Sequence, residues 1–540
     1  MASDDDEHDL QVSTRSFNWR DVKPGSWPRR LVHIGKTLTS LERQEGNVYG
    51  IDKEPKYGIL TYTWGRFPGT NEPSINISGT TWVIPAVSAQ HFTAKSFERA
   101  VRRIGEDVAY VWIDIACIDQ EDEAIKMDEI KNQVAIFANA HRVYVWLSTL
   151  TNASLTGIFN DIFSCEMFLH SQDEEALGKS VPQAYRDLSA SLSSLFKDPW
   201  FSSLWTLQEG TLRSDVLILS KEALPIRHPT IPTTLNIFYG YLLNAFWHVR
   251  SASIEALVRK TLPGEERLAH RVSDQIRLAG FDHAPFSRNP NIQYGAARRR
   301  ETTRPLDRIF GIMAIYGISL GTSKEKENDF DALEHDFANA VNAKSPRLGQ
   351  LFVHTEKPRP GCTWKITQCC RVTNEFGNWE SNGQDSCKIS ATQSIGAVCE
   401  GPTCQLRSLL AVWDHIRAPP PGDNQGSFWC KIRVDDYIHD EHPSLPRLED
   451  YPFELSWENR DRFWPLGSAL LEEFGEESII VLKLGEQAIE MARWAVLGLL
   501  LLRIDDSKGS HRRLGTCQWE KNIFTKFREP DWMHQQGVIC

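Results

Sequence analysis

The sequence predicts an α/β protein that begins with a parallel β-sheet covered by helices on both faces, continues into a helical extension and ends in a mixed α/β region. Between residues 57 and 220, short runs rich in aromatic and β-branched residues alternate with segments whose apolar residues recur every three or four positions. Two of these runs, residues 108–117 and 141–148, are apolar almost throughout, as strands buried on both faces are.

The expected elements follow in a regular order. Strands are expected at residues 31–34, 57–64, 108–117, 141–148 and 215–220. Helices are expected from Pro85 to Ile104, from Asp122 onward and up to about residue 196, with a short helix that carries Trp205 and Glu209. Residues 74–84 are interpreted as a hairpin that turns at residues 78–80. Since strands and helices alternate, we expect parallel strands joined by right-handed crossovers.

The chain has 540 residues, more than one hydrophobic core usually serves. We expect an N-terminal arm at residues 1–56 that is partly disordered, a core domain at 57–220 and a helical extension at 221–320. From about residue 321 the density of cysteine, tryptophan and glycine rises, which predicts a separate accessory domain at 321–540. The sequence does not indicate a fold for that domain beyond mixed α/β.

Charge and composition exclude several classes of function. The net charge is -11, which disfavours broad binding to nucleic acid or to an anionic membrane surface. The first residues, MASDDDEHDL, do not resemble a secretory signal, and the apolar run at residues 494–502 is too short to span a bilayer. We therefore expect a cytoplasmic protein with reduced thiols and without a membrane span.

The most informative segment is WTLQE, residues 205–209. Trp205 and Glu209 are four positions apart, so a helix would place them on one face. Ligands of parallel sheets bind outside the carboxyl ends of the strands, which directs attention to the loops after Trp64, Cys117 and Ser148. The alternative is that Trp205 is a core residue and Glu209 a solvated one.

The loop after the strand at 57–64 offers a second group of candidates. Gly65 allows a tight turn, Arg66 could pair with a phosphate, and Trp64 or Phe67 could stack on a base. A surface loop anchored by aromatic residues is the competing interpretation.

Polar residues follow the apolar run at 108–117. Asp114 lies within that run, so we expect it to be buried and hydrogen-bonded, where it would orient the Trp64 loop or cap a helix. Asp119 and Gln120 lie close behind and are supporting candidates. Cys117 has no histidine partner nearby in sequence and is interpreted as a small buried residue.

Two other clusters are weaker signals. Six thiols lie at positions 362, 369, 370, 387, 399 and 404, but they lack the C-x-x-C spacing of zinc sites, so we expect no metal. Residues 298–300 are three consecutive arginines, which could bind phosphate but are better interpreted as a solvated helix end paired with carboxylates.

Five segments, in this order, resemble the fungal heterokaryon incompatibility (HET) domain. They are YGILTYTWG, YVWIDIACIDQED, QVAIFANAHRVYVWLS, WFSSLWTLQE and, more weakly, RPLDRIFGI. One position of the fourth segment, usually basic in the family, is Leu204 here, and we expect it on the helix surface.

This resemblance carries functional expectations. The HET family is associated with cell death after fusion of incompatible fungal cells, and its domain is similar to flavodoxin-like TIR domains. Several TIR domains cleave NAD with a glutamate preceded by a tryptophan four residues earlier, the spacing of Trp205 and Glu209. By this resemblance Glu209 would be catalytic, and Trp64, Gly65, Arg66, Phe67 and Trp205 would shape the site.

The resemblance leaves two functions open. The first is a nucleotide-consuming death effector that takes NAD as substrate, needs no cofactor and acts as a homo-oligomer. The second is a non-enzymatic signalling module that acts by self-assembly or partner docking. A further hypothesis is that residues 321–540 sense a trigger and hold the first domain inactive.

Overall fold

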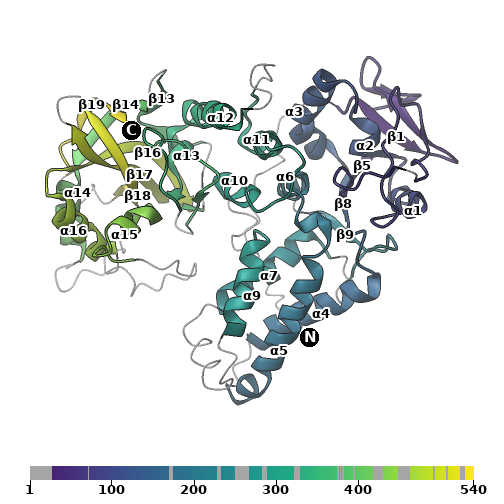
Figure 1. Ribbon diagram of the computed structural model, residues 1–540, viewed down its shortest axis with the longest axis horizontal. Helices are drawn as coiled ribbons and strands as arrows, with labels where there is room; N and C mark the ends of the chain where they lie inside the picture. The colour runs from purple at the N-terminus through teal and green to yellow at the C-terminus, as the bar shows by residue number, and fades with distance from the viewer. Residues whose placement is uncertain are drawn as a thin grey trace, which may run out of the picture.

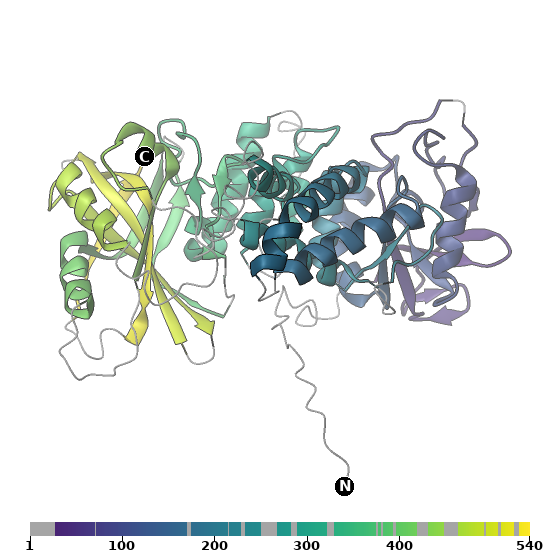
Figure 2. The same ribbon diagram turned by 90° about the horizontal axis from the view of Figure 1, so that it is seen from below.

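The computed structural model describes the chain from residue 27 to residue 540, except for residues 71, 170–173, 214, 228–232, 250–266, 282–288, 321–328, 374–375, 378, 380–381, 393–395, 418–429, 448–462, 491–492, 506–508 and 523–528. Of the N-terminal arm expected at residues 1–56, residues 1–26 lie outside this description, whereas residues 27–56 are described and contain four short strands. Two sheets lie at opposite ends of the molecule with helices between them (Figure 1 and Figure 2).

The first sheet has seven strands in the order β6-β2-β1-β7-β5-β8-β9. Its strands are β1 (Arg30–Ile34), β2 (Leu38–Glu42), β5 (Tyr57–Thr61), β6 (Ile77–Ser78), β7 (Tyr110–Trp112), β8 (Arg142–Trp146) and β9 (Leu217–Leu219). Strands β7, β5, β8 and β9 are parallel, which confirms the predicted parallel sheet. Numbered along the chain, these four strands follow the order 2-1-3-4 that begins a flavodoxin-like sheet. Strands β1 and β2, which precede residue 57, extend it with antiparallel pairs.

Helices α1 (Ala94–Ile104) and α3 (Glu123–Asn139) cover opposite faces of this sheet. Adjacent residues of β5 contact different helices, because successive side chains of a strand point to opposite faces of the sheet. At Gly58 a Cβ would lie 2.7 Å from Ile104 Cγ2 of α1. The Tyr57 hydroxyl instead donates to the Ile136 carbonyl of α3 at 2.6 Å. Glycine at position 58 thus lets α1 approach the strand closely.

Two sequence predictions for residues 74–104 are wrong. Residues 74–84 do not form a hairpin, because β6 pairs in parallel with β2 instead. Gly79 has φ +84°, and a Cβ there would lie 2.3 Å from the Ser40 carbonyl oxygen, so the chain passes β2 rather than folding back on itself. The helix predicted from Pro85 begins only at residue 94, where Thr93 forms a capping box with Ser96.

Residues 221–320 are largely helical where the structure describes them, as predicted. The strand predicted at residues 108–117 is shorter than expected, because residues 114–117 form a helix. The helices are α2 (Asp114–Cys117), α4 (Asn152–Leu169), α5 (Glu174–Leu195), α6 (Leu204–Leu212), α7 (Leu235–Val249), α9 (Arg267–Leu278), α10 (Asn291–Ala297) and α11 (Asp307–Met313), with 3-10 turns at Pro199–Phe201 and Ala314–Tyr316. Helices α4, α5, α7 and α9 pack together as a bundle that projects from the molecule (Figure 1). Among the described residues, every helix is too short or too polar to cross a lipid bilayer.

The C-terminal region is a mixed sheet with helices. Its helices are α12 (Phe330–Lys344), α13 (Pro346–Gln350), α14 (Leu406–Arg417), α15 (Asp436–Glu441) and α16 (Phe463–Phe474). Its larger strands are β13 (Lys388–Ala391), β14 (Ala397–Gln405), β15 (Cys430–Val434), β16 (Ile479–Glu490), β17 (Arg493–Asp505), β18 (Ser510–Glu520) and β19 (Met533–Ile539). Three two-residue strands also belong to this region: β10 (Val353–His354), β11 (Cys370–Arg371) and β12 (Gln384–Asp385). Two others, β3 (Val48–Tyr49) and β4 (Asp52–Lys53), pair with each other before β5.

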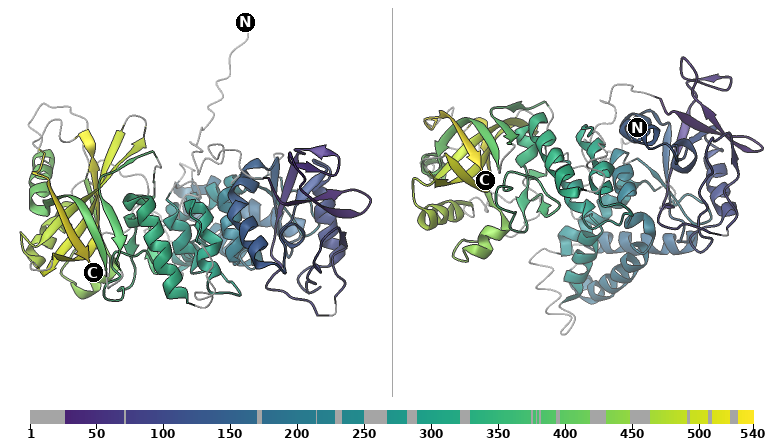
Figure 3. Two further views of the ribbon diagram at one scale, coloured as in Figure 1. Left: turned by 90° about the horizontal axis from the view of Figure 1, so that it is seen from above. Right: turned by 45° about the horizontal axis from the view of Figure 1, so that its top comes forward.

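Strand β14 closes this sheet on itself. It pairs with β16 on one side and with β19 on the other, while β16, β17, β18 and β19 pair in succession (Figure 3). Five strands therefore form a barrel-like ring. The apolar run at residues 494–502 is β17, and it is apolar throughout because both of its faces are covered.

Three hydrophobic cores result. The first fills the sheet of residues 30–219 and the four-helix bundle, and the third lies between the C-terminal sheet and helices α14 to α16. The second joins the two halves of the molecule: it contains Leu204 and Leu207 of α6 together with Leu482 and Leu499 of the C-terminal sheet. Helix α6 itself packs on α3, α10 and α11, and so belongs to the core that the two halves share.

Candidate functional site

The candidate site lies at the carboxyl ends of the parallel strands. Strand β5 has β7 on one side and β8 on the other, so the strand order reverses there. Ligands of open α/β sheets bind at such a point. Thr61, Tyr62 and Trp64 come from the end of β5, Asp114 follows β7, and Glu209 comes from α6. These five residues are called the Glu209 site.

The segment before α6 is held to the sheet by side-chain hydrogen bonds. Asp198 caps the 3-10 turn by accepting from the Trp200 backbone N–H at 3.0 Å, and it accepts from the Thr149 hydroxyl at 2.6 Å. The Trp200 indole N–H donates to the Thr61 hydroxyl at 2.9 Å. A buried carboxylate and a buried indole thus fix the start of α6 against the ends of β8 and β5.

Glu209 points toward the sheet and is only 6% exposed. Burial raises its pKa well above the ordinary value, the nearby negative charge of Asp114 raises it further, and a hydrogen bond from Thr61 acts in the opposite direction. Its Oε2 atom has no hydrogen-bond partner among the described residues. The closed site therefore favours the neutral acid form of Glu209.

Asp114 occupies the first position of α2 and is half-buried. Its Oδ2 accepts from the Trp64 indole N–H at 2.5 Å, and its Oδ1 accepts from the Ile115 backbone N–H at 2.7 Å. Burial raises the pKa of Asp114 to about 6, although these hydrogen bonds oppose the rise. Asp114 thus bonds both to the indole of the Trp64 loop and to the backbone of the first turn of α2.

Trp205 has different surroundings from Glu209. It packs against the second core, where a Cβ at Gly311 of α11 would lie 3.7 Å from its ring. A hydrogen bond from Trp205 also opposes the burial-induced rise in the pKa of Asp307, at the start of α11. Trp205 thus contacts α11, whereas Glu209 contacts residues at the strand ends of the sheet.

The loop after β5 forms a tight turn in which Phe67 N–H donates to the Trp64 carbonyl at 2.8 Å. A Cβ at Gly65 would meet no described atom within 4 Å, so the turn leaves open space at that position. The Phe67 ring stacks on His91 with centroids 3.9 Å apart, and burial lowers the pKa of His91. Phe67 thus anchors the loop to the protein.

Arg66 is directed at the segment that precedes α6. Its guanidinium donates to the Pro199 carbonyl at 3.1 Å and to the Ser202 hydroxyl at 3.0 Å. It also forms an ion pair with Glu301, whose side chain is 70% exposed. The structure therefore brings Trp64, Asp114 and Glu209 together, while Arg66 binds other parts of the same chain.

Asp119 and Gln120 shape the turn between α2 and α3. Asp119 Oδ1 accepts from the backbone N–H groups of Glu121 and Asp122 at 2.9 Å each. Gln120 donates to the carbonyls of Asp114 at 3.2 Å and Ile118 at 2.9 Å. Asp119 also lines an open acidic hollow of about 470 Å³, whose other lining residues are Thr81, Trp82, Glu121, Asp122 and Glu123.

Two sequence-based expectations near the site are wrong. Leu204 does not lie on the helix surface: it is fully buried in the second core, because α6 packs on α11. The arginines at 298–300 are not all solvated. Arg298 does pair with Glu356 at 3.6 Å, but Arg300 is 3% exposed and donates to backbone carbonyls, including Ala279 O at 3.0 Å.

Several cysteines are buried in the hydrophobic cores. Within the described ranges, no three His, Cys, Asp or Glu residues are grouped so that they could hold a metal ion. Cys117 is buried, and burial raises the pKa of its thiol strongly, which favours the unreactive protonated form.

Sequence reasoning missed Thr61, Tyr62 and Glu301 as neighbours of the site. Thr61 and Tyr62 stand in an apolar, aromatic run that reads as core, and only the position at a strand end marks them. Glu301 is 235 residues away from Arg66, so no local pattern connects the two.

Comparison with known proteins finds one family that matches part of the chain. The family model described as "Heterokaryon incompatibility protein (HET)" matches residues 57–209. The chain is also similar to "Heterokaryon incompatibility protein 6, OR allele" from Neurospora crassa, with 23% identity over 202 residues, which covers 31% of this chain and 29% of that protein. No solved structure matches the chain. The chain therefore contains a heterokaryon incompatibility (HET) domain that includes β5 and extends to Glu209 on α6.

Proposed function

We propose that this protein acts in fungal non-self recognition and that its HET domain triggers cell death. The family match over residues 57–209 and the similarity to a heterokaryon incompatibility protein support this role. The similarity covers 29% of that relative, so the proposal concerns the HET domain first.

Induced expression of the full chain in a filamentous fungus tests this role. We expect growth arrest and loss of plasma-membrane integrity within hours of induction, measured with a membrane-impermeant dye. A truncation after residue 317 would be a poor comparison, because it removes Leu482 and Leu499 from the core that buries Leu204 of α6. Unimpaired growth at high expression, both alone and after fusion with strains of different genotype, would refute the proposal.

For the chemistry we propose hydrolysis of the nicotinamide–ribose bond of NAD at the Glu209 site. The C1′–N1 bond would break, with its electron pair moving to the nicotinamide nitrogen, and a water oxygen would bond to C1′ with release of one proton. An ionised carboxylate close to the ribose stabilises the oxocarbenium-like transition state. The observation that supports this reaction best is the pair of carboxyl groups, Asp114 and Glu209, close together where the parallel strand order reverses.

The closed arrangement places a condition on this reaction. Glu209 is 6% exposed and burial favours its neutral form, so substrate access and ionisation both require α6 or the Trp64 loop to move. Opening would hydrate Glu209 and lower its pKa, which couples access to the formation of the charged carboxylate. Assembly of several copies is one event that could supply the opening.

The test is nicotinamide release from NAD by the full-length protein, compared with Glu209→Gln. The matched control is Glu98→Gln, which removes one carboxylate from an exposed pair on α1. We expect release by the wild type and by the control, measured both dilute and under crowding that promotes assembly, and a loss of at least a hundredfold with Glu209→Gln. Equal rates in wild type and Glu209→Gln would rule out this chemistry.

A second function has its own support. Arg66 and Glu209 are both engaged within the chain, as they would be in a signalling module that docks through its surface. A module predicts that Glu209→Gln keeps its toxicity. Toxicity without NAD consumption, retained in Glu209→Gln, would select the module over the enzyme.

A further inference from the structure

Helix α6, which carries Glu209, begins with a contact supplied by a distant segment. The Glu301 backbone N–H donates to the Ser202 carbonyl at 2.6 Å, and the Leu204 N–H donates to the Glu301 carbonyl at 3.1 Å. Ser203, in the N-cap position, makes no side-chain cap within the described part of the chain. The backbone of residue 301 therefore takes over part of the capping that a serine at this position usually provides.

The buried Arg300 reinforces this contact. Its guanidinium donates to the carbonyls of Trp200, Phe201 and Ala279. Because Arg300 is only 3% exposed, removal of its guanidinium would take a buried donor from these three carbonyl groups, of which that of Trp200 would keep the Thr206 hydroxyl. Residue 300 thus joins the start of α6 to the end of α9.

The side chains of residues 301 and 304 contact two other elements around the site. Glu301 pairs with Arg66 of the β5 loop, and Arg304 pairs with Glu123, the first residue of α3, at 3.2 Å. Residues 298–304, called the 298–304 segment, therefore contact the β5 loop, α3 and the start of α6 together. All three lie around the carboxyl ends of β5 and β7.

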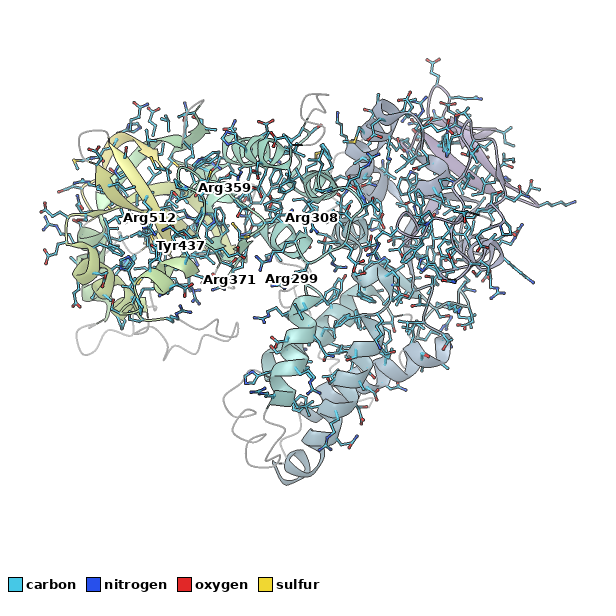
Figure 4. All side chains as sticks on the ribbon, in the orientation of Figure 1. Arg299, Arg308, Arg359, Arg371, Tyr437 and Arg512 are labelled. Atoms are coloured by element: carbon cyan, nitrogen blue, oxygen red, sulfur yellow. The ribbon has the colours of Figure 1, made fainter. Side chains whose placement is uncertain are left out.

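The 298–304 segment is continuous with the C-terminal half. It runs between α10 and α11, and Arg308 of α11 is labelled in Figure 4. The Arg308 guanidinium donates to the Ala297 carbonyl at the end of α10 at 2.6 Å. Both helices belong to the core that also contains strands of the C-terminal sheet. Residues 298–304 therefore connect this core to the start of α6.

We propose that the 298–304 segment is an autoinhibitory contact in which Glu301 occupies the Arg66 guanidinium and holds the β5 loop and α6 closed over Glu209. A carboxylate and a phosphate compete for the same guanidinium, so an anionic nucleotide can bind Arg66 only after Glu301 has left. The contact itself stands independently of the proposed function, but its role as an inhibitor rests on it.

Two substitutions at the exposed residue 301 test the closure in the full-length protein. Glu301→Gln removes the ion pair, and Glu301→Lys replaces attraction by repulsion. The matched control is Glu98→Lys, which reverses a charge in an exposed pair on α1. Hydrogen exchange is followed by mass spectrometry in residues 64–67 and in α6, with β16 and β17 as an internal reference for intact folding.

We expect exchange in these two regions to rise several-fold in Glu301→Gln and at least tenfold in Glu301→Lys, with no change in the control. Combining Glu301→Arg with Arg66→Glu should restore part of the protection, because it rebuilds the attraction with reversed charges. Unchanged exchange in Glu301→Lys, with intact exchange in β16 and β17, would overturn the proposal.

Activity separates this inference from the proposed reaction. With NAD as probe, Glu301→Lys should release nicotinamide faster than the wild type if the site is enzymatic. Faster exchange without any nicotinamide release would refute NAD hydrolysis and retain the autoinhibitory contact for a signalling module. Measurable nicotinamide release at equal rates in wild type and Glu301→Lys would refute inhibition by this contact.

Discussion

Replacement of Asp114 by asparagine tests whether burial raises the pKa of this carboxyl group in the Glu209 site. Burial raises the pKa of Asp114 from 3.8 to about 6, so the native state prefers the protonated acid. This preference stabilises the protein fully below pH 3.8 and is lost as the pH rises through 6. Between pH 4.5 and 7.5 the wild type should lose about 2 kcal/mol that Asp114→Asn does not lose. A roughly constant penalty of about 1 kcal/mol is expected in the variant, because one amide oxygen cannot accept from both Trp64 and Ile115.

The measurement is the first thermal unfolding transition of both proteins at four pH values from 4.5 to 7.5. For a unit of 150–250 residues, a change of about 2 kcal/mol moves Tm by about 4–8 °C, so the variant should gain that much relative to the wild type across the range. The control is Asp128→Asn, which removes one carboxylate from the exposed face of α3. A Tm difference that stays constant with pH, or one that follows the control, would refute the argument that burial of Asp114 sets its pKa.

Three other changes test the packing around the site, with chemical denaturation as the common measurement. Burial raises the pKa of Glu129 to about 7, so Glu129→Gln should gain about 3 kcal/mol relative to wild type as the pH rises from 4 to 8, and a flat difference would contradict it. Gly58→Ala should destabilise by about 1–3 kcal/mol because its Cβ would lie 2.7 Å from a methyl group of α1, whereas Gly157→Ala, in open space on α4, should be neutral or stabilising. Trp200→Phe should cost about 1–2 kcal/mol by removing the indole donor to Thr61, and an unchanged midpoint would show that this hydrogen bond does not hold the start of α6.

The parts of the fold that could be predicted are those set by neighbouring residues. The apolar run at residues 141–148 became β8, and Asp122 became the N-cap of α3, where its carboxylate accepts from two backbone N–H groups. Parallel pairing followed from the alternation of strands and helices. In each case the pattern and the element lie within one stretch of chain.

The parts that could not be predicted depend on contacts between distant residues. The strand at Ile77–Ser78 pairs with β2 because Gly79 passes close to Ser40, a constraint that the sequence near residue 77 does not contain. Burial of Leu204 likewise depends on α11, and the surroundings of Glu209 depend on Asp114 and Thr61. Sequence reasoning could name Glu209 but could not show that the chain covers it.

The closure of the C-terminal ring has a consequence for synthesis on the ribosome. Strand β14 pairs with β13 and β16 along one edge, and its other edge gains a partner only when β19 pairs with it, from Ala397 opposite Ile539 to Thr403 opposite Met533. Pairings of such large sequence separation form late. The sheet of residues 30–219 can therefore fold while the ring is still open, and α6 gains its packing partners α10 and α11 once residue 313 has been synthesised. During that interval the apolar side of α6 is available to chaperones, and a chain that stops before residue 533 would leave β14 with a free edge open to aggregation.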